Sequence, residues 1–199
     1  LEKKAGTDLG EGFVPVAINT EDAAVAIFER TPEAGPWKLL STRRTKTMEE
    51  ELSVAAGEGY RIAAASGGSE LVFALVRPAD AQPVEYRLLS TTRSATMEKE
   101  LNDAAIEGWR FVPSSLAALA GSSSLFGGRT SHEAAIVIEK VASAQPIAYR
   151  IVGARRVSTI EREVTEQVSQ GFGIVAALLG YEETVVILAA PPEAATTVR

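Results

Sequence analysis

A short unit recurs four times in this chain, and this repetition limits the possible folds more than any other feature. Two copies begin at Trp37 and Tyr86 and share 15 of 26 residues without a gap. Another full copy begins at Tyr149, and the chain opens partway through the first copy, which makes four in total. A repeat of this size is one supersecondary unit that buries its apolar face against its neighbours. We therefore expect the four copies to fold alike and to supply one another's interior.

The apolar pattern changes twice within each copy. The third copy opens with YRLLST from Tyr86, a short strand rich in apolar and hydroxyl residues. Met97, Leu101 and Ala104 then fall on one face of a helix, with the same spacing at Met48, Leu52 and Ala55 in the copy before it. An aromatic residue, Trp109, begins a second strand, and a turn leads to a third. This pattern predicts a β-α-β-β repeat.

Residues typical of helix ends bracket each predicted helix. A threonine precedes each apolar run and is interpreted as the N-cap, whose side chain accepts an orphan backbone N–H. A glycine follows the last turn, where a left-handed C-terminal cap is common. The threonines are Thr47, Thr96 and Thr159, and the glycines are Gly59, Gly108 and Gly171.

The third strands, such as LVFALVR and TVVILAA, lack clean alternation, which is typical of strands buried on both faces. We expect an α+β fold of tandem β-α-β-β repeats, with mainly antiparallel sheets and helices packed on the outer faces. A second layer or a partner subunit then covers the other face. The expected boundaries are 1–34 for a truncated first repeat, 35–82 for the second, 83–145 for the third with an insertion at 113–132, and 146–199 for the fourth with a C-terminal tail.

Composition excludes several classes of function. A net charge of −6 argues against a nucleic-acid binder, which usually presents a basic surface. The absence of cysteine excludes disulfides, thiolate metal sites and cysteine nucleophiles. No apolar run approaches the roughly 18 residues of a transmembrane helix. Because the chain opens partway through a repeat and without methionine, we expect an exported protein, periplasmic or secreted.

A short signature follows the helix in three copies. It reads Glu-Gly-aromatic at 107–109, 58–60 and 11–13, and it changes to Gln-Gly-Phe at 170–172. Together with the Tyr-Arg strand before the helix, it resembles a widespread bacterial family of small modules of unknown function. The resemblance covers nearly the whole chain, one module at a time. It implies a fold and no reaction.

Residues suited to catalysis are few. The single histidine, His132, lies in a Gly/Ser-rich stretch, where a general base is rarely held with the needed precision. One histidine also rules out a histidine-cluster zinc site within one chain. An enzyme would have to use the carboxylates ahead of the third strands, which we expect at solvated hairpin rims: Asp22, Glu70, Glu133 and Glu183. We predict no catalytic residue, no metal and no cofactor.

An arginine precedes each full helix, at Arg44, Arg93 and Arg156. Arginine beside a helix N-terminus can hold a phosphate or a carboxylate. The alternative is a structural role, in which each arginine covers an aromatic ring or pairs with a glutamate of a neighbouring repeat. These three residues are the candidate anion-binding site.

A second pattern places a glutamate at the end of a helix and an arginine three residues later. The pairs are Glu58 with Arg61 and Glu107 with Arg110, and both partners change together in the last copy. We expect an ion pair that braces the turn from helix to strand.

One feature breaks the repeat. From Trp109 to Glu133 the chain takes 24 steps, against 10 from Tyr60 to Glu70. This insertion carries apolar residues at Leu116, Leu119, Leu125 and Phe126. They can cover a sheet edge, contact another subunit or bind a ligand, because long loops in compact domains often carry function; the alternative is that the insertion is disordered.

Two functions remain for the chain as a whole. The first is a non-catalytic structural or interaction module, whose partner is a protein, a surface polymer or a second copy of the chain. The second is a protein that binds a small anion through the arginines before the helices.

Overall fold

The computed structural model describes residues 12–20, 25–31, 35–120, 132–142, 145, 147–179 and 184–191. Within these residues it has three helices and twelve strands, and every strand pair is antiparallel. The expected α+β class is therefore confirmed. The first repeat contributes β1 (Phe13–Asn19) and β2 (Val25–Arg30), which form a two-stranded sheet.

Repeats two to four share one topology, in which the third strand of the repeat is central and the other two flank it. The second repeat comprises β3 (Trp37–Thr42), α2 (Thr45–Gly57), β4 (Arg61–Ser66) and β5 (Leu71–Val76). The third comprises β6 (Tyr86–Thr91), α3 (Ser94–Ile106), β7 (Trp109–Phe111), the short 3₁₀ helix η1 (Pro113–Ser115), β8 (Ala117–Ala120) and β9 (His132–Lys140). The fourth comprises β10 (Ala148–Ala154), α4 (Val157–Ser169), β11 (Gly173–Leu179) and β12 (Thr184–Ala190).

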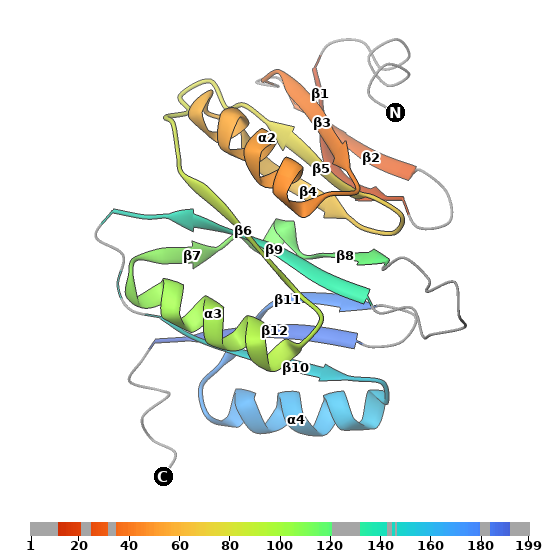
Figure 1. The fold of residues 1–199 in the computed structure, drawn as a ribbon, viewed down its shortest axis with the longest axis vertical. Coiled ribbons are helices and arrows are strands. Elements are labelled where there is room, and N and C mark those ends of the chain that lie inside the picture. The colour runs from red at the N-terminus through yellow and green to blue at the C-terminus, as the bar shows by residue number, and fades with distance from the viewer. Residues whose placement is uncertain are drawn as a thin grey trace.

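The repeats are stacked one on the next, so that helices alternate with sheets (Figure 1). The α2 helix contacts its own strand β3 and also β6 of the third repeat, and α3 contacts β6 and β10 in the same way. Of the three described helices, only α4 covers an outer face, at one end of the stack. The expected position of the helices on outer faces thus describes α4, whereas α2 and α3 lie between sheets.

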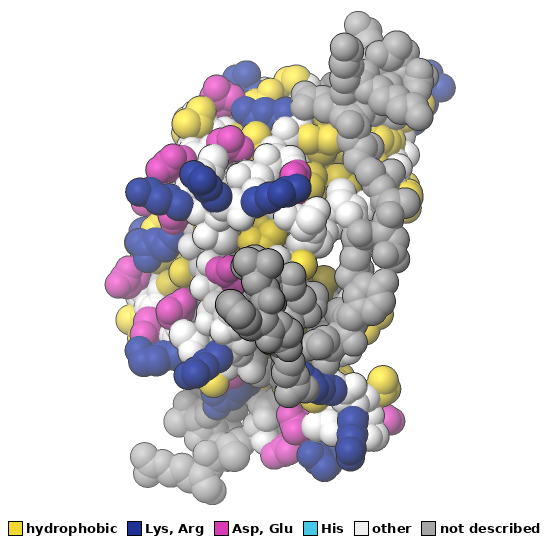
Figure 2. All heavy atoms as spheres, turned by 45° about the vertical axis from the view of Figure 1, so that its right-hand side comes forward, with side chains coloured by type: hydrophobic (Ala, Val, Ile, Leu, Met, Phe, Trp, Pro, Cys, Tyr) yellow, Lys and Arg dark blue, Asp and Glu magenta, His cyan; other side chains and the backbone are white. Residues whose placement is uncertain are grey.

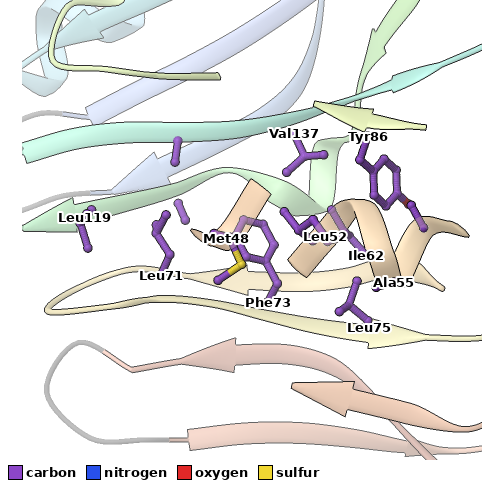
Figure 3. Packing of buried hydrophobic residues seen from close by; sticks show 13 residues of the cluster. Met48, Leu52, Ala55, Ile62, Leu71, Phe73, Leu75, Tyr86, Leu119 and Val137 are labelled. Carbon is purple, nitrogen blue, oxygen red and sulfur yellow. The ribbon is translucent and has the colours of Figure 1, made fainter. Parts of the chain in front are cut away.

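The apolar clusters explain this order. In β9, Ala135 and Val137 belong to the cluster around α2, whereas Ile136 and Ile138 belong to the cluster around α3. Successive side chains of a strand point to opposite faces, so one strand contributes to two cores. Figure 3 shows Val137 and Tyr86 approaching α2 from one side, while Phe73 of β5 approaches it from the other. The uninterrupted apolar pattern of the third strands therefore reflects burial on both faces by neighbouring repeats.

The helix ends differ in part from the prediction. The N-cap residues are Arg44, Arg93 and Arg156, each with extended backbone and no side-chain cap hydrogen bond. The threonines expected at this place are each the third residue of their helix. The N-cap prediction was wrong because the helix continues toward its N-terminus beyond the apolar run. The C-terminal prediction is confirmed, since Gly59, Gly108 and Gly171 have φ of +87°, +88° and +91°.

Candidate interaction site

Two of the helices bond the next repeat through a glutamate at the same position. The carboxylate of Glu49 in α2 accepts the backbone N–H of Leu88 in β6 at 3.4 Å. The carboxylate of Glu98 in α3 accepts the N–H of Ile151 in β10 at 2.8 Å. Both β6 and β10 are edge strands, whose outward N–H groups need a partner. The glutamate thus satisfies an edge that would otherwise be open to pairing with another chain.

A second hydrogen bond across each of these two boundaries comes from the tyrosine that opens the next repeat, whose hydroxyl bonds the backbone of the preceding repeat. The Tyr149 hydroxyl accepts the backbone N–H of Phe111 at 3.1 Å. At the equivalent place, the backbone of Ile62 hydrogen-bonds the hydroxyl of Tyr86. Burial, together with the charge of Glu139, raises the pKa of Tyr86 to about 12. Burial also raises the pKa of Tyr149, so both hydroxyls stay protonated near neutral pH.

The joint between the third and fourth repeats has two additional bonds. The Asn102 side-chain amide donates to the Tyr149 carbonyl at 3.0 Å, and its oxygen accepts the Tyr149 N–H at 2.9 Å. Arg150 also pairs with Glu98 at 2.9 Å. The residue of α2 at the position of Asn102 is Ser53, which bonds the Glu49 carbonyl of its own helix. Asparagine at this position therefore ties α3 to the next repeat, where serine does not.

In repeats two to four, the basic residue of the opening strand lies over the aromatic ring that follows the helix. Lys38 lies 4.1 Å from the centre of the Tyr60 ring, and Arg87 lies 4.4 Å from that of Trp109. In the last copy, Arg150 lies 5.8 Å from the Phe172 ring. A cation over an aromatic face contributes about 0.5–1 kcal/mol at an exposed site. The residues that identify the repeat thus have a structural role in repeats two to four.

The stack ends on a face that is buried in the other repeats. Ile62 and Phe111 are each 7% exposed beneath the following repeat, whereas Ile174 at the equivalent position of β11 is 57% exposed. The equivalent helix position shows the same change, because Ala56 and Ala105 are buried and Val168 is 49% exposed. No residue of α4 is buried. We call this surface of α4 and β11, which includes Val168 and Ile174, the terminal face.

The other end of the stack shows the complementary half of a joint. Ala74, Val137 and Ile187 occupy equivalent positions of the central strands and are fully buried, whereas Ile27 of β2 is 59% exposed. Its neighbour on the same face, Val25, is 55% exposed. We call this surface of β2 the initial face. In each later repeat the corresponding surface lies against the repeat before it.

The insertion in the third repeat joins two repeats. Its first part forms η1 and β8, and β8 pairs with β9. Ala118 and Ala120 then exchange backbone hydrogen bonds with Gly68, in the turn of the second repeat, at 2.8 and 2.7 Å. Inside the insertion, Ser115 is fully buried, and its hydroxyl accepts the Val137 N–H at 2.8 Å. The side chain of Ser115 thereby replaces a strand residue where the chain departs from β9.

Two of the four candidate residues in the insertion are core residues. Leu116 belongs to the cluster around α3 and Leu119 to the cluster around α2, with exposures of 8% and 9%. They bind the repeats of this chain together and leave little surface for a partner. Leu125 and Phe126 lie outside the described residues.

The three candidate arginines begin three successive helices. Their carbonyl oxygens accept the first helical hydrogen bonds, for example from Met48 to Arg44 at 3.0 Å. Their side chains are exposed and make no ion pair with the residues that the structure describes. All three helices run in the same direction, so their first turns lie on one side of the stack (Figure 1). A sheet separates each helix from the next, which keeps the arginines from converging on one site.

The predicted ion pairs at the helix-to-strand turns were wrong. Glu58 pairs with Lys38 at 2.8 Å, and this contact lowers the Glu58 pKa. Arg61 instead donates to the carbonyls of Gly59, Tyr60 and Gln82. Arg110 likewise donates to the carbonyls of Ala105 and Trp109. Each arginine thus bonds carbonyls around the turn from helix to strand, and the Ala105 carbonyl lies at the negative C-terminal end of α3, which attracts a cation.

The candidate catalytic residues do not form a site in the described part of the chain. Glu70 accepts a hydrogen bond from Ser41 and lies 3.4 Å from Arg43, at a hairpin rim. His132 is the first residue of β9, rather than a loop residue as predicted. Asp22 and Glu183 lie outside the described residues. Among the described residues, no three histidine, aspartate or glutamate side chains are arranged to hold a metal ion.

A polar cleft that sequence reasoning missed lies between α3, β10 and α4. It has a volume of about 360 Å³, and its lining includes Glu98, Arg150, Arg162 and Gln167. The first two are bonded to each other, and Arg162 pairs with Glu163 at 3.4 Å. The side-chain oxygen of Gln167 is buried without a hydrogen-bond donor. The basic and acidic side chains are thus largely engaged, and Figure 2 shows the same mixture of charges across one face of the molecule.

Comparisons with protein families, with curated proteins and with solved structures each found no match for this chain. The resemblance to a bacterial module family therefore stays a prediction from the motifs. None of the described helices is long and apolar enough to cross a membrane.

Proposed function

We propose that this chain is a non-catalytic interaction module, in which a stack of repeats presents two apolar end faces to protein partners. The observation that carries the proposal is the contrast between equivalent residues. Ile174 is 57% exposed, where Ile62 and Phe111 are buried under the next repeat. Large apolar side chains that gather on an exposed face are typical of protein–protein interaction sites.

The contacts within the chain support this proposal. The conspicuous recurring residues hold repeats together or brace a turn: Glu98 bonds the next strand, and Arg87 covers the Trp109 ring. The candidate arginines lie on separate helices. Anion binding by Arg44, Arg93 and Arg156 stays the weaker alternative, since it would require three separate sites on three helices.

Site-specific photo-crosslinking in the producing cells tests the proposal. A photoreactive residue at Ile174 is expected to give protein adducts, because the terminal face is covered when a partner binds. The matched control is Ile106, which is 86% exposed on α3 and lies outside both end faces. Equal adducts at both positions, or none at Ile174, would contradict the proposed function.

A further inference from the structure

We infer that two copies of this chain stack head to tail, with the initial face of one copy on the terminal face of the next. This inference rests on the proposed function and names its partner. The two surfaces are the two halves of a joint that the chain forms internally between its second and third and between its third and fourth repeats.

The first half of the joint is supplied by the central strand of a repeat. Val137 of β9 packs into the cluster around α2, and Ile187 of β12 packs into the cluster around α3. Each side chain is fully buried by the preceding repeat. Ile27 has the equivalent position in β2 and is 59% exposed. The next residue, Phe28, packs on Trp37 of the second repeat with ring centroids 5.3 Å apart, and successive residues of a strand point to opposite faces, so Ile27 points away from the second repeat. The initial face therefore has the chemistry of a surface that a preceding repeat covers.

The second half is supplied by a helix and the strand that follows it. In the third repeat, Leu101, Ala105 and Phe111 line this surface and are buried with Tyr149 and Ile187 of the fourth repeat. On the fourth repeat the corresponding surface carries Val168 and Ile174, while Val164 packs against the cluster of its own sheet. Val168 and Ile174 are 49% and 57% exposed. The fourth repeat covers this surface of α3, whereas no described part of the chain covers the terminal face in the same way.

Helix α4 also carries a glutamate at the position that bonds the next repeat in α2 and α3. Glu161 occupies the position of Glu49 and Glu98, which accept N–H groups from the edge strands β6 and β10. Within the described residues β2 pairs only with β1, so it is an edge strand of its sheet. The described first repeat has no strand equivalent to β6 and β10, so in a stacked copy β2 offers the edge that a glutamate of the other copy would bond.

The geometry favours a second copy over an unrelated partner. The surface equivalent to the initial face is buried in the second, third and fourth repeats, so the first repeat alone offers it. The chain carries one initial face and one terminal face, and the two faces differ from each other. Association of this kind is heterologous, so it extends into a chain of copies unless the rotation closes a ring.

Light scattering of the purified chain over a range of concentrations tests the inference. The mass is expected to rise with concentration beyond that of two 21.0 kDa chains. Ile27→Glu and Ile174→Glu each remove one face at an exposed position, so each variant alone is expected to fold and stay monomeric. An equimolar mixture retains one intact pair of faces and is expected to stop at a dimer. The control Ile106→Glu is expected to associate like the parent chain.

Disulfide crosslinking gives an independent measurement, because the chain contains no cysteine. The double variant Ile27→Cys, Ile174→Cys is expected to form a ladder of linked chains on mild oxidation. Each single variant is expected to give no ladder. A dimer that forms through Ile174→Cys alone indicates a symmetric contact and overturns the head-to-tail arrangement.

The two proposals fail in distinguishable ways. A parent chain that stays monomeric at every concentration overturns self-stacking. If photo-crosslinking at Ile174 then yields adducts whose added mass is not a multiple of 21.0 kDa, the interaction module stands with a different partner. If the parent chain stays monomeric and photo-crosslinking at Ile174 gives no adduct, both proposals are wrong.

Discussion

Glu98 of α3 accepts the backbone N–H of Ile151 at 2.8 Å, across the boundary between two repeats. Glu49 and Leu88 form the same bond one repeat earlier, at 3.4 Å. The helix of one repeat thus completes the edge strand of the next. This relationship makes the repeats a continuous stack rather than a row of separate modules.

Glu98→Gln is expected to lower the free energy of unfolding by about 1–2 kcal/mol, because it weakens a charge-assisted bond to a partly buried strand. The matched control, measured at a dilution that keeps the chain monomeric, is Glu161→Gln on α4, which has the same helical position but no following strand in its own chain. Its effect is expected to stay within about 0.5 kcal/mol. Urea unfolding of both variants measures the difference. Equal losses would show that the cost comes from the helix itself.

Gly67→Ala is expected to loosen the contact between the second and third repeats. A Cβ at Gly67 would lie 1.7 Å from the Ala118 carbonyl oxygen, so the β8 backbone would have to move. Gly57→Ala is the control, because a Cβ there meets nothing within 4 Å and alanine favours a helix by up to about 1 kcal/mol. Thermal unfolding is expected to fall for the first variant and to hold or rise for the second. A neutral Gly67→Ala would contradict the close approach of β8.

Stability is expected to decrease at alkaline pH. Burial raises the pKa of Tyr86 to about 12, above the ordinary value of 10 that applies in the unfolded chain. The folded chain therefore holds this proton more tightly, so its contribution is complete below pH 10 and is lost as pH rises toward 12. Two pKa units correspond to about 2–3 kcal/mol at most. Denaturant unfolding of the parent chain and of Tyr86→Phe between pH 10 and 12 measures this loss of stability. If the free energy of unfolding changes with pH in the same way for both chains, the burial of the Tyr86 hydroxyl is contradicted.

The replaced ion pair gives a fourth test. Because Arg110 bonds the carbonyls of Ala105 and Trp109, it makes no contact that depends on the Glu107 side chain. A double-mutant cycle of Glu107→Gln and Arg110→Met is expected to give a coupling energy near zero. Arg110→Met alone is expected to cost about 1–2 kcal/mol, since carbonyls at the helix end lose a charged donor. A coupling of about 1 kcal/mol or more would restore the ion pair that the spacing suggested.

The sequence predicted the repeat, its elements and the fold class, because each depends on local periodicity. The glycine after each helix, such as Gly108, could be identified since only one backbone conformation suits that turn. The position of the helices between sheets could not. It depends on Glu98 and Asn102 reaching a strand that is 47 or more residues away along the chain.

The candidate site was found only in part, for physical reasons. Leu116 and Leu119 stood out as apolar residues in a long insertion, but composition does not tell a covered core residue from a docking residue. Ser115 gave no signal, because a serine among Gly and Ser residues looks solvated. The end faces also escaped notice, since Ile174 and Ile27 resemble ordinary strand residues until their equivalents are seen to be buried.

The most direct test of the stack compares one substitution at two equivalent positions. Ile62 is 7% exposed under Tyr86 of the next repeat, whereas Ile174 is 57% exposed. At a dilution that keeps the chain monomeric, Ile62→Ala is expected to lower the free energy of unfolding by about 2–5 kcal/mol. Ile174→Ala is expected to lower it by less than about 1 kcal/mol. Equal losses at the two positions would contradict the account, because they would mean that no repeat buries the one before it.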